Sequence, residues 1–255
     1  YTTQEKLKIK KLQLKKKNKL KKTILISGAN SSLAQGVVVE LIKSNNVILI
    51  YRKTKPKFDF GKSCFYIKYD FTSDKNDILN LSKKINKKFK VNSILHFNGL
   101  HAFSTFKISN NLKFRSVFDA NCLTFVNVIK LCYYLKSVDS VTTISSVSSL
   151  EGSKGISLYS SSKSALNNLA KCAAIELSQK KIRVNTIILG HINSGMGMKV
   201  NNFLNEKQLK DLEQKHLLGF GEVKDLVHSI KFLIDKKKSR WITGVNFHLD
   251  GGYSA

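Results

Sequence analysis

A serine, a tyrosine and a lysine are spaced in this sequence as a unit for carbonyl chemistry. Ser146 precedes Tyr159 by thirteen residues, and Lys163 follows Tyr159 by four. On a helix, a tyrosine and a lysine at this spacing project from the same face about one turn apart. A phenol has a pKa of about 10, and a nearby ammonium lowers that pKa toward the range in which proton transfer is efficient. The pattern predicts a serine that polarises a carbonyl oxygen and a tyrosine that exchanges a proton with it.

The tyrosine and lysine alone are also typical of an ordinary helix surface pair, so the surrounding elements must decide. Apolar, strand-like runs are predicted at 23–27, 47–51, 64–68, 93–97, 141–145, 183–189 and 245–249, and helical patterns at 33–43, 74–89, 112–136, 158–178 and 224–234. Alternation of strand and helix indicates a parallel sheet. We therefore expect an α/β fold in residues 23–255, a single doubly wound Rossmann domain with about seven parallel strands and helices on both faces.

The strongly basic composition leaves a second class of function open. The net charge is +27, from 44 lysines and arginines against 17 acidic residues. Such a charge attracts nucleic acid or an anionic membrane surface. Lysine is spread along nearly the whole chain with many asparagines and isoleucines, however, which fits a general residue-usage bias equally well. We do not expect nucleic acid to be the primary partner.

Residues 1–22 form a separate basic zone. They hold ten lysines, one acidic residue and no arginine. A block of like charges is usually solvated, and this one lacks the apolar core of a secretory signal. The zone is predicted to be an N-terminal extension outside the fold, with binding to DNA or an anionic surface as the rival role.

Cysteine usage and hydropathy indicate the compartment. The four cysteines are scattered, with no C-x-x-C spacing and no histidine cluster that would suggest a metal site. No apolar run approaches the roughly 20 residues of a membrane helix. We expect no metal, no membrane span and a reduced, cytoplasmic setting.

The turn after the first strand is a candidate phosphate loop. It runs from Ser27 to Gly36 and reads S-G-A-N-S-S-L-A-Q-G. A glycine-containing turn between strand and helix places backbone N–H groups and the positive helix end where a pyrophosphate can sit. After the second strand the chain has Arg52 and Lys53 and no acidic residue, which favours NADP(H) over NAD(H), unless both simply follow the basic bias.

Over about residues 23–253 these motifs resemble the short-chain dehydrogenase/reductase superfamily, classical type. The loop is similar to T-G-x-x-x-G-x-G, with Gly28 retained and Ser32 and Ala34 at the other two glycine positions. Y-D-F-T resembles the adenine-contacting D-x-T segment, F-N-G-L stands where the superfamily has N-N-A-G, and L-G-H-I-N-S replaces P-G-x-I-x-T. The resemblance implies cofactor contacts at Gly28, Asn30, Ser31, Ser32, Leu33, Arg52, Asp70, Phe71, Asn98, Gly99, Tyr159, Lys163, Ile192 and Ser194.

The resemblance also assigns the catalytic roles. Ser146 would polarise the carbonyl, and it is preferred over its neighbour Ser145 by the interval to Tyr159. Tyr159 would transfer the proton, Lys163 would lower the pKa of Tyr159 and hold the nicotinamide ribose, and Asn121 would hold a water that links the lysine to solvent. The I-T-G and D-G-G signatures near the C-terminus lie at a subunit contact in the superfamily's tetramers, which implies a dimer or tetramer.

The pattern is nearest to 3-oxoacyl-[acyl-carrier-protein] reductases. This implies a small or carrier-linked carbonyl substrate, a 3-oxoacyl thioester or a keto-sugar, bound under an apolar lid in residues 194–216. The alternative is a non-catalytic dinucleotide-binding regulatory protein, which the altered glycine loop favours and the four retained catalytic positions oppose. His96 and His101, on either side of Asn98, are expected to be structural.

Overall fold

Seven parallel strands form one sheet. The computed structural model describes residues 21–57, 60–73, 75, 77–201 and 204–255. The strand order is β3-β2-β1-β4-β5-β6-β7. The strands are β1 (Lys22–Ser27), β2 (Asn45–Tyr51), β3 (Cys64–Lys68), β4 (Val91–His96), β5 (Ser140–Ile144), β6 (Arg183–Leu189) and β7 (Asn246–Leu249). The predicted α/β sheet is confirmed.

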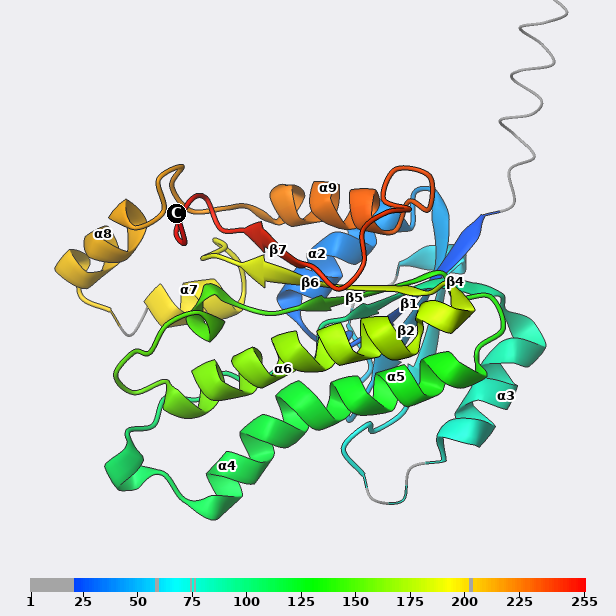
Figure 1. The fold of residues 1–255 in the computed structure, drawn as a ribbon, viewed down its shortest axis with the longest axis horizontal. Coiled ribbons are helices and arrows are strands. Elements are labelled where there is room, and N and C mark those ends of the chain that lie inside the picture. Colours follow the sequence, from blue (N-terminus) through cyan, green and yellow to red (C-terminus); the bar gives the residue numbers. More distant parts are fainter. Residues whose placement is uncertain (1–20, 58–59, 74, 76, 202–203) are drawn as a thin grey trace, which may run out of the picture.

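Helices cover both faces of the sheet (Figure 1). On one face lie α2 (Ser32–Leu41) and α9 (Val223–Leu233), and on the other lie α3 (Ile78–Lys88), α5 (Thr124–Tyr134) and α6 (Ser157–Glu176). Within β1, Ile24 and Ile26 join the core under α2 and α9, whereas Leu25 joins the core under α3, α5 and α6. Strand side chains alternate between faces, and burial of both faces explains the continuous apolar runs in the sequence.

Most element boundaries differ from the predictions by a few residues. β1 begins at Lys22, which was assigned to the basic extension, and residues 1–20 of that extension lie outside the described residues. The helical stretch predicted at 112–136 is continuous from 111 to 134, and it consists of α4 (Asn111–Phe118), a π-helical turn (Asp119–Leu123) that was not predicted, and α5.

The expected lid region contains two helices that were not predicted. They are α7 (Met196–Asn201) and α8 (Glu206–Gln214), and residues 202–203 between them lie outside the described residues. α8 has no fully buried residue, and its apolar face consists of Leu209 and Leu212, which are half-buried while the other residues of the helix are exposed. Its start also has a sequence signal, the capping box between Asn205 and Gln208.

The sheet order has a topological switch point between β1 and β4. β1 pairs with β2 on one side and with β4 on the other, so the order of the strands reverses between β1 and β4. In open α/β sheets, ligands bind outside the carboxyl ends of the strands at such a point.

No helix in the described parts of the chain combines the length and the hydropathy that a membrane span requires.

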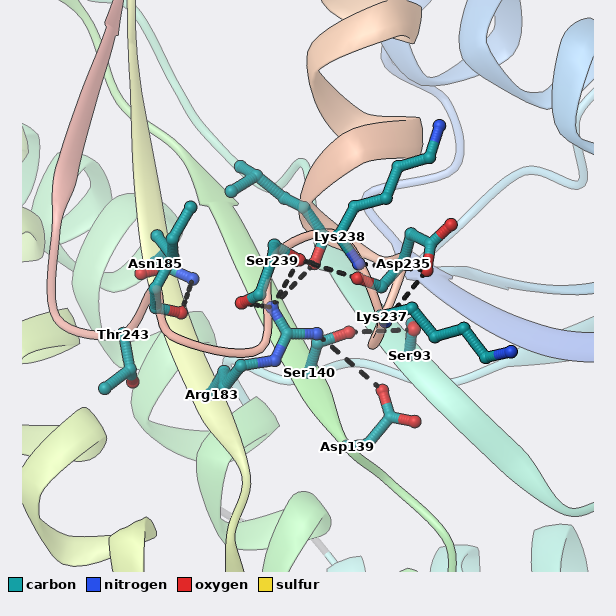
Figure 2. A network of polar contacts seen from close by, with 12 residues as sticks. Ser93, Asp139, Ser140, Arg183, Asn185, Asp235, Lys237, Lys238, Ser239 and Thr243 are labelled. Carbon is teal, nitrogen blue, oxygen red and sulfur yellow. Dashed lines mark hydrogen bonds and ion pairs between the residues drawn. The ribbon is translucent and has the colours of Figure 1, made fainter.

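Figure 2 shows the contacts of Arg183, the first residue of β6, at the opposite end of the sheet. Its Nη1 donates to the Leu233 carbonyl at 2.8 Å and to the Ser239 carbonyl and Oγ at 3.2 and 2.9 Å. The guanidinium therefore ties the start of β6 to the end of α9 and to the turn that leads to β7. The role of Arg183 is structural.

Candidate active site

The end of β5 and the first turns of α6 bring Ser146 next to Tyr159. The Ser146 hydroxyl hydrogen-bonds the Tyr159 side chain, and its Oγ accepts the Ser148 N–H at 3.2 Å. The neighbouring Ser145 instead donates from Oγ to the Lys163 carbonyl at 3.4 Å. Ser146, the serine chosen from the interval, is thus the one that meets the phenol.

Lys163 lies beside the same tyrosine, one helical turn along. Its Nζ is 5.9 Å from the Tyr159 ring centroid and donates to the Ile144 carbonyl at 2.9 Å. The two residues are only 7% and 5% exposed. Burial raises the pKa of Tyr159 to about 12, although the Ser146 hydrogen bond lowers it, and burial lowers the pKa of Lys163 to about 8.

The expected lowering of the Tyr159 pKa by Lys163 is therefore not found in this structure. Desolvation disfavours the charged form of both groups, and for Tyr159 it outweighs the hydrogen bond from Ser146. The ammonium is engaged by the Ile144 carbonyl at the end of β5. The phenol thus holds its proton at neutral pH, which is the state of a proton donor.

Asn121 comes from the π-helical turn between α4 and α5. Its Oδ1 accepts the Leu100 N–H at 2.7 Å, and its Nδ2 donates to the Leu100 carbonyl at 3.2 Å and to Ser162 Oγ at 2.7 Å. Such turns are frequent at functional sites because they add a residue to the helix and redirect a side chain. Asn121 thereby joins the loop after β4 to α6, next to Lys163.

Gly99 lies where Asn121 and Lys163 converge. A Cβ at this position would lie 3.2 Å from Asn121 Oδ1 and 3.3 Å from Lys163 Nζ. Both distances are shorter than ordinary van der Waals contact, and hydrogen bonds to other groups hold both side chains. Glycine at position 99 leaves room for the two polar groups to approach each other.

The two histidines near Gly99 have different surroundings. His96 is fully buried between Thr143 Oγ1 at 2.9 Å and Thr124 Oγ1 at 3.0 Å, and burial lowers its pKa to about 3. Its expected structural role fits these bonds. The His101 ring lies 4.5 Å from the Tyr159 ring, centroid to centroid, and burial lowers its pKa. No sequence pattern indicated that His101 packs on Tyr159.

The phosphate loop is shaped by Gly28, at the carboxyl end of β1. Its φ is +77°, and a Cβ there would lie 2.6 Å from Asn98 N and Phe97 C. Ser31 precedes α2, and its side chain makes no capping bond within the described residues. α2 begins at Ser32, and its first N–H groups are therefore not capped by the Ser31 side chain.

Two buried oxygens at the switch point between β1 and β4 fit a polar ligand. Ser27 Oγ and Asn98 Oδ1, at the ends of β1 and β4, have no hydrogen-bond partner among the described residues. Buried polar groups are nearly always hydrogen-bonded, so unpaired oxygens at a ligand-binding edge fit the hydroxyl groups of a nucleotide sugar. The residues present are compatible with a dinucleotide.

The residues predicted to contact the adenosine part of the dinucleotide follow β2 and β3. Arg52 is exposed just after β2, and Asn30 Nδ2 donates to the Thr54 carbonyl at 2.7 Å, which ties the phosphate loop to the turn that carries Arg52. Asp70 Oδ1 accepts the N–H and the hydroxyl of Thr72 at 2.9 and 2.7 Å. The Phe71 side chain is part of the core, so a cofactor contact there would be made by its backbone.

Ile192 and Ser194 follow the carboxyl end of β6, at the same edge of the sheet. The Asn193 N–H donates to the Gly221 carbonyl at 3.0 Å, which pairs this segment with the chain before α9. His216, which no sequence pattern indicated, is buried and its Nε2 accepts the His191 N–H at 2.9 Å. The end of α8 is therefore fixed to the end of β6.

Hydroxyl groups, an ammonium and an amide thus converge at one edge of the sheet. No group of three or more histidine, cysteine or acidic residues in the described ranges could hold a metal ion. The arrangement offers hydrogen bonds and a proton to a carbonyl oxygen.

The buried charge of Lys163 predicts an unusual dependence of stability on pH. Because its pKa falls from 10.5 to about 8 on folding, the charged form costs the folded state about 3 kcal/mol. The cost is full below about pH 8 and disappears as the pH rises toward 10.5, since the unfolded chain then binds more protons. Lys163→Met should therefore raise the free energy of unfolding at about pH 7 by about 1–2 kcal/mol, after the lost Ile144 hydrogen bond is subtracted.

Urea unfolding at about pH 7 and about pH 10 measures this effect, and the gain should vanish at the higher pH. Lys171→Met, an exposed lysine on the same helix, is the control. A Lys163→Met effect that is the same at both pH values would contradict the assigned cost of burial.

The chain is similar in sequence to proteins of known family. A family model described as enoyl-(acyl carrier protein) reductase matches residues 28–254. A 3-oxoacyl-[acyl-carrier-protein] reductase of Buchnera aphidicola subsp. Baizongia pistaciae is 31% identical over 249 residues, which cover 91% of this chain and 97% of the relative. The reductase of the same name from Rickettsia conorii is 29% identical over 244 residues, with 91% and 96% covered.

Solved structures share the fold. A 4-hydroxyisoleucine dehydrogenase complexed with NADH has a TM-score of 0.80 at 27% identity, over 91% of this chain and 98% of that chain. A short chain dehydrogenase family protein from Francisella tularensis has a TM-score of 0.78 at 22% identity, over 92% and 99%. With the family match along most of its length, this chain belongs to the short-chain dehydrogenase/reductase superfamily and is an NAD(P)-dependent oxidoreductase that acts on CH–OH and C=O groups.

Proposed function

We propose that this protein reduces a carbonyl with NADP(H) through Ser146, Tyr159, Lys163 and Asn121. The observation that carries the proposal is the hydrogen bond between Ser146 and Tyr159, with Lys163 one helical turn away. Two adjacent hydroxyl groups in a buried site can both donate to one carbonyl oxygen, where negative charge develops during reduction. The same groups would serve alcohol oxidation in the reverse direction.

Each side chain has a defined task in this proposal. Ser146 donates to the carbonyl oxygen, and Tyr159, whose pKa of about 12 keeps it protonated at neutral pH, delivers the proton to the same oxygen. The Lys163 ammonium stabilises the phenolate that remains. Asn121 fixes the Leu100 backbone, and with it the position of Gly99 beside the lysine.

A bound nicotinamide dinucleotide supplies or accepts the hydride. Its phosphates would lie at the first N–H groups of α2, near Ser31 and Ser32, and its ribose groups near the unpaired oxygens of Ser27 and Asn98. Further contacts would come from Asn30, Leu33, Asp70, Phe71, Gly99, Ile192 and Ser194. Arg52, with no acidic residue at the end of β2, supports NADP(H) over NAD(H).

An acyl thioester is the substrate class that we favour. Large apolar side chains that stay exposed follow the carboxyl ends of the central strands and α8, namely Leu100, Phe103, Leu150, Met198 and Leu217. A keto-sugar would instead call for several polar side chains at this edge. The curated relatives named above are 3-oxoacyl-[acyl-carrier-protein] reductases, which also supports a 3-oxoacyl thioester substrate.

The rival functions receive less support. A non-catalytic regulatory protein would have no physical reason to keep the ammonium of Lys163 buried, at a cost to its stability. The anionic-surface role of the basic extension concerns residues outside the described ranges. That role, self-association and a cytoplasmic location stay predictions.

Replacement of the phenol tests the proposed function directly. With acetoacetyl thioester and NADPH, Tyr159→Phe should lower kcat by about 10³, because the proton donor is lost while the ring remains. The dissociation constant of NADPH should change by less than about threefold. Tyr134→Phe, an exposed tyrosine on α5, is the control, and a Tyr159→Phe enzyme with ordinary turnover would refute the mechanism.

Charge reversal at Arg52 tests the cofactor preference. Arg52→Glu should weaken NADPH binding about 10- to 100-fold and NADH binding much less, because only NADPH carries a 2′-phosphate for the guanidinium to bind. Fluorescence titration of both cofactors measures the ratio. The matched control is Lys84→Glu on the exposed face of α3. Equal losses of affinity for the two cofactors would show that Arg52 does not bind the 2′-phosphate.

A methyl group at position 99 tests the convergence of Asn121 and Lys163. Gly99→Ala should lower kcat by about tenfold or more, since its Cβ would displace two positioned polar groups. Gly152→Ala, whose Cβ would meet nothing within 4 Å, should leave kcat unchanged. Steady-state kinetics measure kcat, and the thermal midpoint shows whether each variant is folded. A Gly99→Ala enzyme with wild-type kcat would show that activity does not depend on the fixed positions of Asn121 and Lys163.

A further inference from the structure

Ser32 of the phosphate loop contacts Gly195, in the segment between β6 and α7. A Cβ at Gly195 would lie 1.5 Å from Ser32 Oγ and 2.7 Å from Ser32 Cβ, but 3.8 Å from Ser32 Cα. The Ser32 side chain therefore fills the space that a side chain at position 195 would need. Glycine at position 195 makes room for serine at position 32.

This contact lies at the carboxyl edge of the sheet, where the phosphates of a dinucleotide would bind. β6 is three strands from β1, a lateral distance of about 14 Å, so the segment after β6 must run back along the edge to reach α2. α9 helps to hold both parts in place. The chain before it pairs with Asn193, and a Cβ on Gly36 of α2 would lie 2.6 Å from Val223 Cγ1 at its start.

Ser32 also stands where the superfamily loop has glycine. We propose that Ser32 and Gly195 are a matched pair, in which the side chain gained at position 32 is accommodated by the side chain absent at position 195. The pair sets the position of the segment after β6 relative to the first N–H groups of α2. As far as it concerns cofactor affinity, this inference rests on the proposed function.

A side chain at position 195 would disturb the phosphate site. Rotation of the Ser32 hydroxyl would relieve the overlap with Oγ, but Ser32 Cβ at 2.7 Å cannot rotate away. Either the segment after β6 or the start of α2 must then move, because close-packed groups transmit strain. Phosphate binding depends on the direction in which the first N–H groups of α2 point, so a small displacement of the start of α2 weakens it.

A double-mutant cycle tests the pair. The dissociation constant of NADPH is measured by fluorescence titration for the wild type, Ser32→Gly, Gly195→Ala and the double variant. Gly195→Ala should weaken binding by about tenfold with Ser32 present, and by no more than about threefold with glycine at position 32. The strain of alanine at the Gly195 φ of +53° is common to both backgrounds and cancels. Ser31→Gly combined with Gly195→Ala is the control and should show no rescue.

Thermal unfolding midpoints without cofactor provide a second readout, because the overlap exists without NADPH. Gly195→Ala should lower the midpoint more with Ser32 than with glycine at position 32, and equal losses or no losses in the two backgrounds would overturn the pair. If Gly195→Ala does not fold, a folded double variant supports the pair and an unfolded one refutes it. The Gly195→Ala loss of midpoint can depend on residue 32 although none of the four proteins binds NADPH. That result would refute the proposed cofactor and still support the Ser32–Gly195 pair.

Discussion

The ammonium of Lys163 is held almost out of solvent at the end of β5, and the catalytic half of the site is shaped around it. A buried charge is tolerated only where polar groups surround it, which explains the hydrogen bond to the Ile144 carbonyl. The absent side chain of Gly99 leaves room for the ammonium, and the π-helical turn brings Asn121 to the same place. Burial raises the pKa of Tyr159, so the phenol stays protonated at neutral pH. Burial also lowers the pKa of Lys163, so the ammonium loses its proton at a lower pH than an exposed lysine.

The cofactor half of the site is built mainly from backbone. Gly28 lets β1 and β4 approach closely at the point where the strand order reverses. The exposed start of α2 and the unpaired oxygens of Ser27 and Asn98 lie beside that point.

The elements that the sequence predicted well are those with a strong local signal. β3 and β6 were predicted to the residue because each is a compact strand-like run. The helical spacing of Tyr159 and Lys163 and the interval to Ser146 likewise depend only on regular geometry, and the structure brings the three residues together.

The features that were missed depend on tertiary contacts. The π-helical turn at Asn121 lies inside an unbroken helical pattern, and α8 is a short helix whose apolar face has only two residues, Leu209 and Leu212. The contact of His101 with Tyr159 follows from the path of a loop. The direction of the Tyr159 pKa shift is a balance between burial and the hydrogen bond from Ser146, and the depth of burial cannot be read from sequence spacing.

The central claim is that the Ser146, Tyr159 and Lys163 site serves hydride transfer to a carbonyl. The most direct measurement is the fate of deuterium carried at C4 of the nicotinamide of NADPH when the protein is mixed with acetoacetyl thioester. With the transferable position labelled, deuterium should appear at the carbinol carbon of the 3-hydroxy product in one-to-one ratio with the NADPH oxidised. A 3-hydroxy product without deuterium at that carbon would contradict the account.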